Sequence, residues 1–232
     1  MRIPLILPIL WLAATTAAAQ TPAPPQTNKP NAFEKEILAF EASDRTNPPP
    51  KHAVLFVGSS SIRLWKTLAQ DLPNRRVINR GFGGSQIADS IHFAERIVLP
   101  YEPATIVFYA GGNDLNAGKT PQVVFNDYKT FVAQVRAKLP DTKIAYISIA
   151  GNPARWSQIE RVREVNQLIQ AYSRTLPGLS YIDTATAMLG TDGLPRPEIF
   201  VADKLHMNTN GYAIWTRVIG EHLQQLDAEK KP

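Results

Sequence analysis

Three residues of this 232-residue chain could together carry out nucleophilic chemistry: Ser60, Asp203 and His206. A serine hydroxyl is a poor nucleophile until a neighbouring base removes its proton, and histidine suits that task near neutral pH. Asp203 lies three residues before His206, a spacing that brings a carboxylate beside an imidazole within one turn of chain. These residues predict a Ser–His–Asp site. The alternative is that Ser60 caps a helix and that Asp203 is an exposed helix-start residue beside a solvated His206.

The remaining histidines are less suited to act as the base. His52 precedes the first predicted strand, His92 lies inside a predicted helix and His222 lies in the closing helix. We expect all three to be packing or surface residues.

Asn113 and Gly84 could complete such a site as an oxyanion hole. The side-chain amide of Asn113 and the backbone N–H groups of Gly84 and Ser60 would supply three donors, and removing one donor costs about 2.7–4 kcal/mol. Glycine at position 84 would let the backbone approach a substrate closely. The alternative is that Asn113 and the glycines serve only turn geometry, which they also favour.

Short apolar runs alternate along the chain with segments of helical spacing. Strands are predicted at 53–57, 76–79, 105–109, 143–149 and 179–182, and helices at 33–40, 62–68, 86–96, 121–139, 159–172 and 209–226. Continuous apolar strands separated by helices indicate a parallel sheet covered on both faces. The pattern therefore predicts a three-layer α/β/α fold with a five-stranded, flavodoxin-like sheet.

This fold would bring the candidate residues together. Parallel strands end at one edge of the sheet, where ligands bind in open α/β folds. Segments 58–61, 79–84 and 111–114 follow predicted strands and must gather at that edge. Segment 203–206 can join them if the last helix packs beside the first strand.

The N-terminus resembles a secretion signal. Arg2 precedes an apolar run at 3–14, which is too short to span a bilayer comfortably, and small residues at 17–19 fit signal-peptidase cleavage after Ala19. We therefore expect a signal peptide at 1–19 and a periplasmic or secreted protein. An uncleaved membrane anchor is the alternative.

The rest of the chain fits one domain. Residues 20–32 are rich in Pro, Thr, Ala and Gln and are predicted to be a disordered linker, which leaves a single domain at 33–228. The absence of cysteine excludes disulfides, thiolate metal sites and a lipoprotein anchor. The net charge of +5 is spread along the chain without a basic stripe, so we expect no nucleic-acid partner.

Taken together, these blocks resemble the SGNH, or GDSL-type, hydrolase family. That family is named for Ser, Gly, Asn and His in four separate blocks, and here they are Ser60 after Gly58, Gly84, Asn113 in Gly-Gly-Asn-Asp, and His206 in Asp-x-x-His. The segments FVGSSSIRLW and DKLHMNTNGYAIW are especially similar to a secreted bacterial branch related to platelet-activating-factor acetylhydrolase-like esterases. The resemblance covers roughly residues 33–226.

The resemblance implies a serine esterase that needs no metal and no cofactor. It assigns catalysis to Ser60, Asp203 and His206, the oxyanion hole to Ser60, Gly84 and Asn113, and the reaction to two-step acyl transfer. One departure concerns Ser59, which stands where the family's Gly-Asp-Ser has aspartate. Ser59 is accordingly the alternative nucleophile.

The substrate is expected to be a small-molecule or carbohydrate ester with a short, acetyl-like acyl group. Arg63, Phe82, Asn116, Arg155 and Trp156 are candidates for lining its pocket. Four alternatives stay open: a lysophospholipase, a thioesterase, an acyltransferase, and a non-catalytic ligand- or glycan-binding module. No stable membrane anchor is expected after cleavage of the signal.

Overall fold

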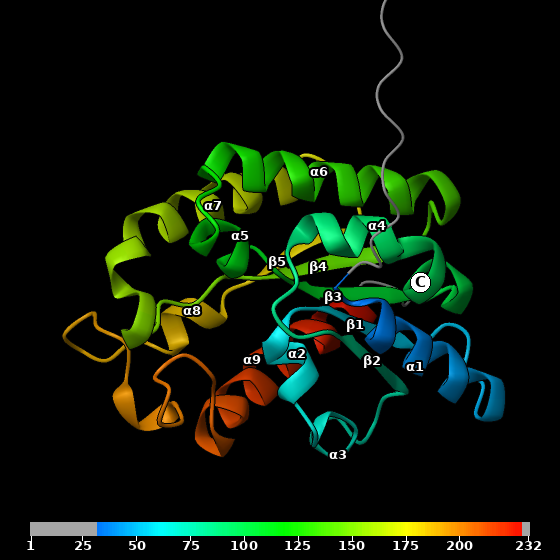
Figure 1. Cartoon of the computed structure of the whole chain (residues 1–232), viewed down its shortest axis with the longest axis horizontal. Helices are drawn as coiled ribbons and strands as arrows, with labels where there is room; N and C mark the ends of the chain where they lie inside the picture. Colours follow the sequence, from blue (N-terminus) through cyan, green and yellow to red (C-terminus); the bar gives the residue numbers. More distant parts are fainter. Residues whose placement is uncertain (1–31, 229–232) are drawn as a thin grey trace, which may run out of the picture. The chain divides into compact units, whose positions relative to one another are not determined.

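One entirely parallel sheet forms the centre of the computed structural model, which describes residues 32–228 (Figure 1). The predicted signal peptide and the predicted linker up to residue 31 lie outside the described residues. The strands are β1 (Val54–Gly58), β2 (Val77–Gly81), β3 (Thr105–Tyr109), β4 (Lys143–Ile147) and β5 (Leu179–Ile182). Their order across the sheet is β2-β1-β3-β4-β5, and every neighbouring pair is parallel. The predicted five-stranded, flavodoxin-like sheet is confirmed.

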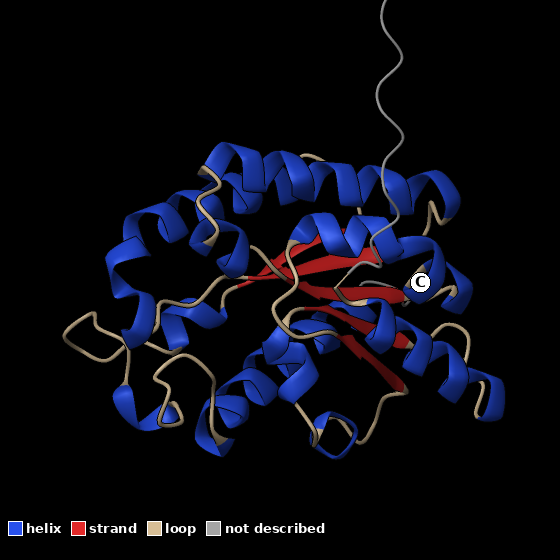
Figure 2. Ribbon diagram, viewed as in Figure 1, coloured by secondary structure: helices blue, strands red, loops and turns tan. Residues whose placement is uncertain are grey.

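Helices cover both faces of this sheet, as Figure 2 shows. One core lies between the sheet and α1 (Glu34–Thr46), α4 (Ile87–Ile97), α6 (Pro121–Lys138) and α7 (Ile159–Ser173). The other lies between the sheet and α2 (Ser60–Leu64), α3 (Leu68–Asp71), α8 (Thr184–Ala187) and α9 (Thr209–Ala228). Side chains alternate along β1, so Leu55 and Val57 enter the first core while Val54 and Phe56 enter the second. The three-layer α/β/α architecture is confirmed.

A cluster of aromatic side chains packs the last helix, α9, against strand β1 and helix α2. Trp65, at the end of α2, contacts Phe56 of β1 edge-on and stacks on Tyr212 of α9, at centroid distances of 5.7 and 5.5 Å. Trp215 of α9 meets the same Trp65 ring edge-on. Such pairs contribute about 0.5–1.5 kcal/mol each beyond the area they bury. The last helix thus packs beside the first strand, the condition needed to bring residue 206 to the sheet edge.

Several short helices differ from the sequence prediction. The single helix predicted at 62–68 is two helices, α2 and α3, because Asn79 Nδ2 donates to Ile62 O at 2.8 Å and Trp65 leaves helical geometry. The remaining short elements, none of them predicted, are α8 and, in addition, η1 (Leu99–Tyr101), α5 (Gly112–Asn116), η2 (Pro153–Gln158) and η3 (Pro197–Ile199). One or two turns carry too few residues to show a helical period. Between residues 32 and 228, no helix is long and apolar enough to cross a membrane.

Candidate active site

A turn that only glycine can form places Ser60 at the carboxyl edge of the sheet. Gly58 ends β1 with φ +141°, and a Cβ at this position would lie 1.9 Å from the carbonyl oxygen of Tyr109 in the adjacent strand β3. Only glycine allows this approach. The turn continues through Ser59, whose N–H donates to Tyr109 O at 3.0 Å, and α2 then begins at Ser60.

The structure brings Ser60, His206 and Asp203 together. His206 Nε2 lies 2.9 Å from Ser60 Oγ, and His206 Nδ1 lies 2.6 Å from Asp203 Oδ2. With the Nδ1 proton donated to the carboxylate, Nε2 is free to accept the proton of the serine hydroxyl. The hydrogen-bond partner of the imidazole Nε2 is therefore Ser60 and not Ser59. This arrangement can activate a serine hydroxyl for attack on a carbonyl carbon.

The carboxylate of Asp203 is hydrogen-bonded to the backbone of the turn that follows it. Asp203 Oδ1 accepts the backbone N–H groups of Leu205 and His206, both at 2.9 Å, while Oδ2 faces the imidazole. The backbone N–H of His206, its imidazole and the N–H of Leu205 favour the ionised carboxylate and lower the pKa of Asp203 to about 2. Asp203 is thus a permanent negative charge at physiological pH, suited to stabilise an imidazolium.

Gly84 lies in the turn between β2 and α4, with φ +84° and open space where a Cβ would be. Phe82 N donates to Gly58 O at 3.0 Å, which ties this turn to the end of β1, and Ser85 Oγ donates to Phe82 O at 2.9 Å. The turn is therefore anchored on both sides of Gly84, beside the strand that leads to Ser60.

Asn113 lies in α5, directly after β3. Its side-chain Nδ2 donates to Ser85 O at 3.1 Å, and its Oδ1 accepts from Arg155 at 3.1 Å. Because an amide nitrogen carries two protons, one N–H of Asn113 is left to donate to a ligand. The two contacts also fix which end of the amide is the donor.

Ser60, His206 and Asn113 line one small cavity of about 50 Å³. The cavity reaches between the sheet edge, η2 and the start of α9. Much of its remaining wall is apolar, from Tyr109, Ile149, Val162, Met188, Phe200, Met207 and Trp215. A cavity of roughly 10–15 Å³ holds one water molecule, so this larger cavity has room for a short acyl group. Within residues 32–228 no three acidic or histidine side chains gather in a way that could hold a metal ion.

Among the five residues predicted to line the pocket, Arg155 does so. It lies in η2, and its guanidinium bonds Asn113 Oδ1, as described above. Asn116 is one contact removed: its Oδ1 accepts from Gln158, which does line the cavity.

The other three predicted pocket residues do not line the cavity. Phe82 is fully buried in the core, edge-on to the rings of Phe33 and Phe93. Burial of a large aromatic ring stabilises the fold more than its exposure to solvent at the sheet edge would. Arg63 points to the surface and pairs with Glu36 at 3.1 Å. Trp156 packs over Gly151, where its ring would lie 2.7 Å from an added Cβ.

Sequence reasoning missed the apolar wall of the cavity and the neighbour of Asn113. Met188, Met207 and Trp215 are buried and apolar, so nothing in the sequence separates them from ordinary core residues. Asp114 is different: it is an acidic residue directly after the candidate donor Asn113, and an acid beside a site residue is a signal that could have been followed.

Comparisons with known proteins agree with this geometry. The model of the GDSL-like lipase/acylhydrolase family matches residues 55–214, a range that contains all five candidate catalytic and oxyanion residues. Human platelet-activating factor acetylhydrolase IB subunit alpha1 is 25% identical over 203 residues, which cover 82% of each chain.

Two solved structures share the fold. A GDSL-like lipase from Bacteroides thetaiotaomicron has a TM-score of 0.70 at 18% identity, covering 82% of this chain and 98% of that one. A carbohydrate esterase family 3 protein from Talaromyces cellulolyticus has a TM-score of 0.61 at 19% identity, covering 77% of this chain and 99% of that one.

Proposed function

Because the chain belongs to the GDSL-like lipase/acylhydrolase family and is therefore a serine ester hydrolase, we propose that it removes short acyl groups, acetyl above all, from carbohydrate or other small esters. The observation that carries the proposal is the 2.9 Å contact between His206 Nε2 and Ser60 Oγ in the wall of a cavity of about 50 Å³.

In the first half of the reaction, His206 Nε2 takes the proton of Ser60 as Oγ bonds to the ester carbonyl carbon. The negative charge that moves onto the carbonyl oxygen is met by the N–H groups of Ser60 and Gly84 and by the second amide N–H of Asn113. Asp203 stabilises the imidazolium. His206 then gives its proton to the departing alkoxide as the carbon–oxygen bond breaks, which leaves an acyl-serine.

In the second half, water takes the place of the alcohol. His206 removes a proton from the water as its oxygen attacks the acyl carbon, and the same donors hold the oxyanion. When the tetrahedral intermediate collapses, Ser60 Oγ leaves and recovers its proton from His206. The products are a carboxylic acid and the free enzyme.

The size of the cavity supports a short acyl group. Met188 and Trp215, both almost fully buried, form part of the apolar wall of the cavity. A long acyl chain would have to displace packed core side chains, which costs about 1–3 kcal/mol or more. The human relative is an acetylhydrolase by name, and the Talaromyces structure is a carbohydrate esterase, which supports an acetylated carbohydrate as the substrate class.

Kinetics with p-nitrophenyl esters test this proposal. Wild type should cleave the acetate with a much higher kcat/KM than the octanoate and should release acetate from acetylated sugars. Ser60→Ala should lose roughly 10⁶-fold in kcat, as removal of a triad serine does, whereas the neighbouring Ser59→Ala should stay active. A fluorophosphonate should label the peptide that contains Ser60. Undiminished turnover in Ser60→Ala would end the proposal.

We also propose that the protein is exported, with cleavage after Ala19. The support is the sequence of the first 19 residues: one basic residue, an apolar run and a small-residue triplet. Mass spectrometry of protein from a periplasmic or culture fraction should find an N-terminus at Gln20. A full-length chain in the membrane fraction would contradict the proposal and favour an uncleaved anchor.

A further inference from the structure

Asp114 carries a carboxylate that is fully buried and that the proposed reaction does not use. Its exposed fraction is 0%, and it follows Asn113 directly within α5. Burial raises the pKa of Asp114 above its ordinary value, while Lys119 opposes that effect. Burying a charge is costly unless it is paired and hydrogen-bonded, so such a group beside a candidate oxyanion donor needs an explanation.

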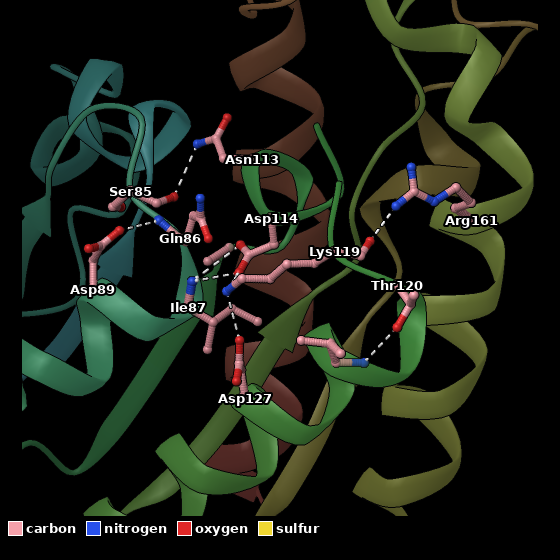
Figure 3. A network of polar contacts seen from close by, with 12 residues as sticks. Ser85, Gln86, Ile87, Asp89, Asn113, Asp114, Lys119, Thr120, Asp127 and Arg161 are labelled. Carbon is pink, nitrogen blue, oxygen red and sulfur yellow. Dashed lines mark hydrogen bonds and ion pairs between the residues drawn. The ribbon is translucent and has the colours of Figure 1, made fainter. Parts of the chain in front are cut away.

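A small network compensates this buried charge, as Figure 3 shows. Ile87 N, at the first residue of α4, donates to Oδ1 and Oδ2 of Asp114 at 3.3 and 3.2 Å. Lys119 Nζ lies 2.8 Å from Asp114 Oδ1 and 2.8 Å from Asp127 Oδ2. The carboxylate thus faces the positive end of an eleven-residue helix and is held there by a lysine that a second carboxylate shares.

The network reaches the turn that carries Gly84. Asn113 Nδ2 donates to Ser85 O, and Ile87 N donates to the adjacent Asp114. Asn113 and Asp114 of α5 are therefore hydrogen-bonded to Ser85 and Ile87, which follow Gly84 closely in the chain. If the Asp114 contact is lost, the Asn113–Ser85 bond is the polar contact that remains between these two pairs of residues.

We propose that Asp114 is a positioning residue that fixes the Asn113 amide and the Gly84 N–H relative to each other, so that both donors meet one oxyanion. This inference rests on the proposed esterase function. Asp114 touches neither substrate nor Ser60 and acts through Asn113 and Ile87. The Lys119 ammonium favours the ionised form of Asp114 and contacts its Oδ1, and Arg155 donates to the Asn113 amide oxygen from the other side.

An oxyanion exists only in the tetrahedral states, so misplaced donors should slow turnover without weakening substrate binding. Loss of one complete donor costs about 10²–10³-fold in kcat, and displacement of donors that are still present should cost no more than the lower end of that range. Asp114→Asn keeps the shape and one acceptor but removes the charge. We expect its kcat to fall roughly 10–100-fold, with KM within about twofold of wild type.

Asp127→Asn is the matched control, because it makes the same chemical change at the other carboxylate of Lys119 and leaves the Ile87 contact in place. Its kcat should stay within about threefold of wild type. A trifluoromethyl ketone, which forms an oxyanion on the active serine, should bind Asp114→Asn more weakly by about the factor lost in kcat. Competitive inhibition by the alcohol product should be unchanged. A merely structural role would not split these two affinities.

If Asp114→Asn fails to fold, Lys119→Gln is a second test of the inference. It leaves Asp114 and Ile87 in place and removes the ammonium group that contacts the Asp114 carboxylate. The same fall in kcat, with KM preserved, supports the inference. Wild-type kcat in folded Asp114→Asn, or an equal loss in Asp127→Asn, overturns it. Failure of the proposed function is a separate result, because it appears as full activity in Ser60→Ala.

Discussion

The indole ring of Trp65, five residues after Ser60, lies edge-on against that of Trp215 in the helix after His206, with centroids 5.9 Å apart. This contact joins the element that carries the nucleophile to the element that follows the base. Ser60 and His206 are 146 residues apart in the chain, so their 2.9 Å approach depends on how these two elements pack.

Trp65→Ala should therefore weaken both the fold and the site. Removing a fully buried tryptophan costs about 3–5 kcal/mol in the free energy of unfolding, measured by urea denaturation. We expect kcat to fall as well, because α2 and α9 lose the ring that separates and aligns them. Trp65→Phe, which keeps an aromatic contact, should recover part of both quantities. Unchanged stability and kcat in Trp65→Ala would show that the cluster does not align the site.

Asp203→Asn should lose catalysis while keeping the fold. The amide can no longer stabilise an imidazolium, and it favours the wrong imidazole tautomer, a change that costs a buried triad roughly 10⁴-fold in kcat. Steady-state kinetics measure this, with Asp192→Asn as the control because Asp192 is an exposed turn residue distant from His206 in sequence. A loss of less than about tenfold would mean that Asp203 is not the partner that makes His206 a base.

The ionisation of Asp203 should also appear in the pH dependence of stability. Its pKa is about 2 in the folded protein and near its ordinary 3.8 when unfolded, so folding favours the charged form. The contribution is therefore complete above about pH 4 and is lost as the pH falls toward 2. Urea midpoints of wild type and Asp203→Asn should differ at neutral pH and converge over this interval. A difference that grows on acidification would contradict the direction of the shift.

Met188→Ala should broaden acyl-chain selectivity. Met188 is buried in the apolar wall of the cavity, and truncating it opens space beside the acyl group while costing about 2–5 kcal/mol of stability. The ratio of kcat/KM for p-nitrophenyl hexanoate over acetate should rise at least about tenfold, which corresponds to 1.4 kcal/mol. Leu194→Ala, at an exposed position, is the control and should leave the ratio unchanged. An unaltered ratio in Met188→Ala would place the acyl group elsewhere.

The parts of this structure that follow from short-range rules could be predicted from sequence. Apolar runs predicted the strands, and the carboxyl-edge rule predicted that Ser60 and Asn113 gather, as their places in the wall of one cavity show. The nearness of Asp203 to His206 followed from a three-residue spacing. These predictions need only local pattern and one topological rule.

What could not be predicted depends on packing across elements. Phe82 is core because the rings of Phe93, in the next helix, and of Phe33, from a distant segment, pack against it. The grip of Asp114 on Ile87 spans 27 residues and leaves no periodic trace. The cavity is bounded by side chains of the same types as the core, so its size is set by three-dimensional packing that composition does not encode.

The placement of the base next to the closing helix has a consequence for how activity develops. The segments through β3 contain Ser60, Gly84 and Asn113, whereas Asp203 and His206 come only after β5. Since Trp65 and Trp215 join α2 to α9, we expect that during refolding from urea ester cleavage recovers no earlier than the packing of α9.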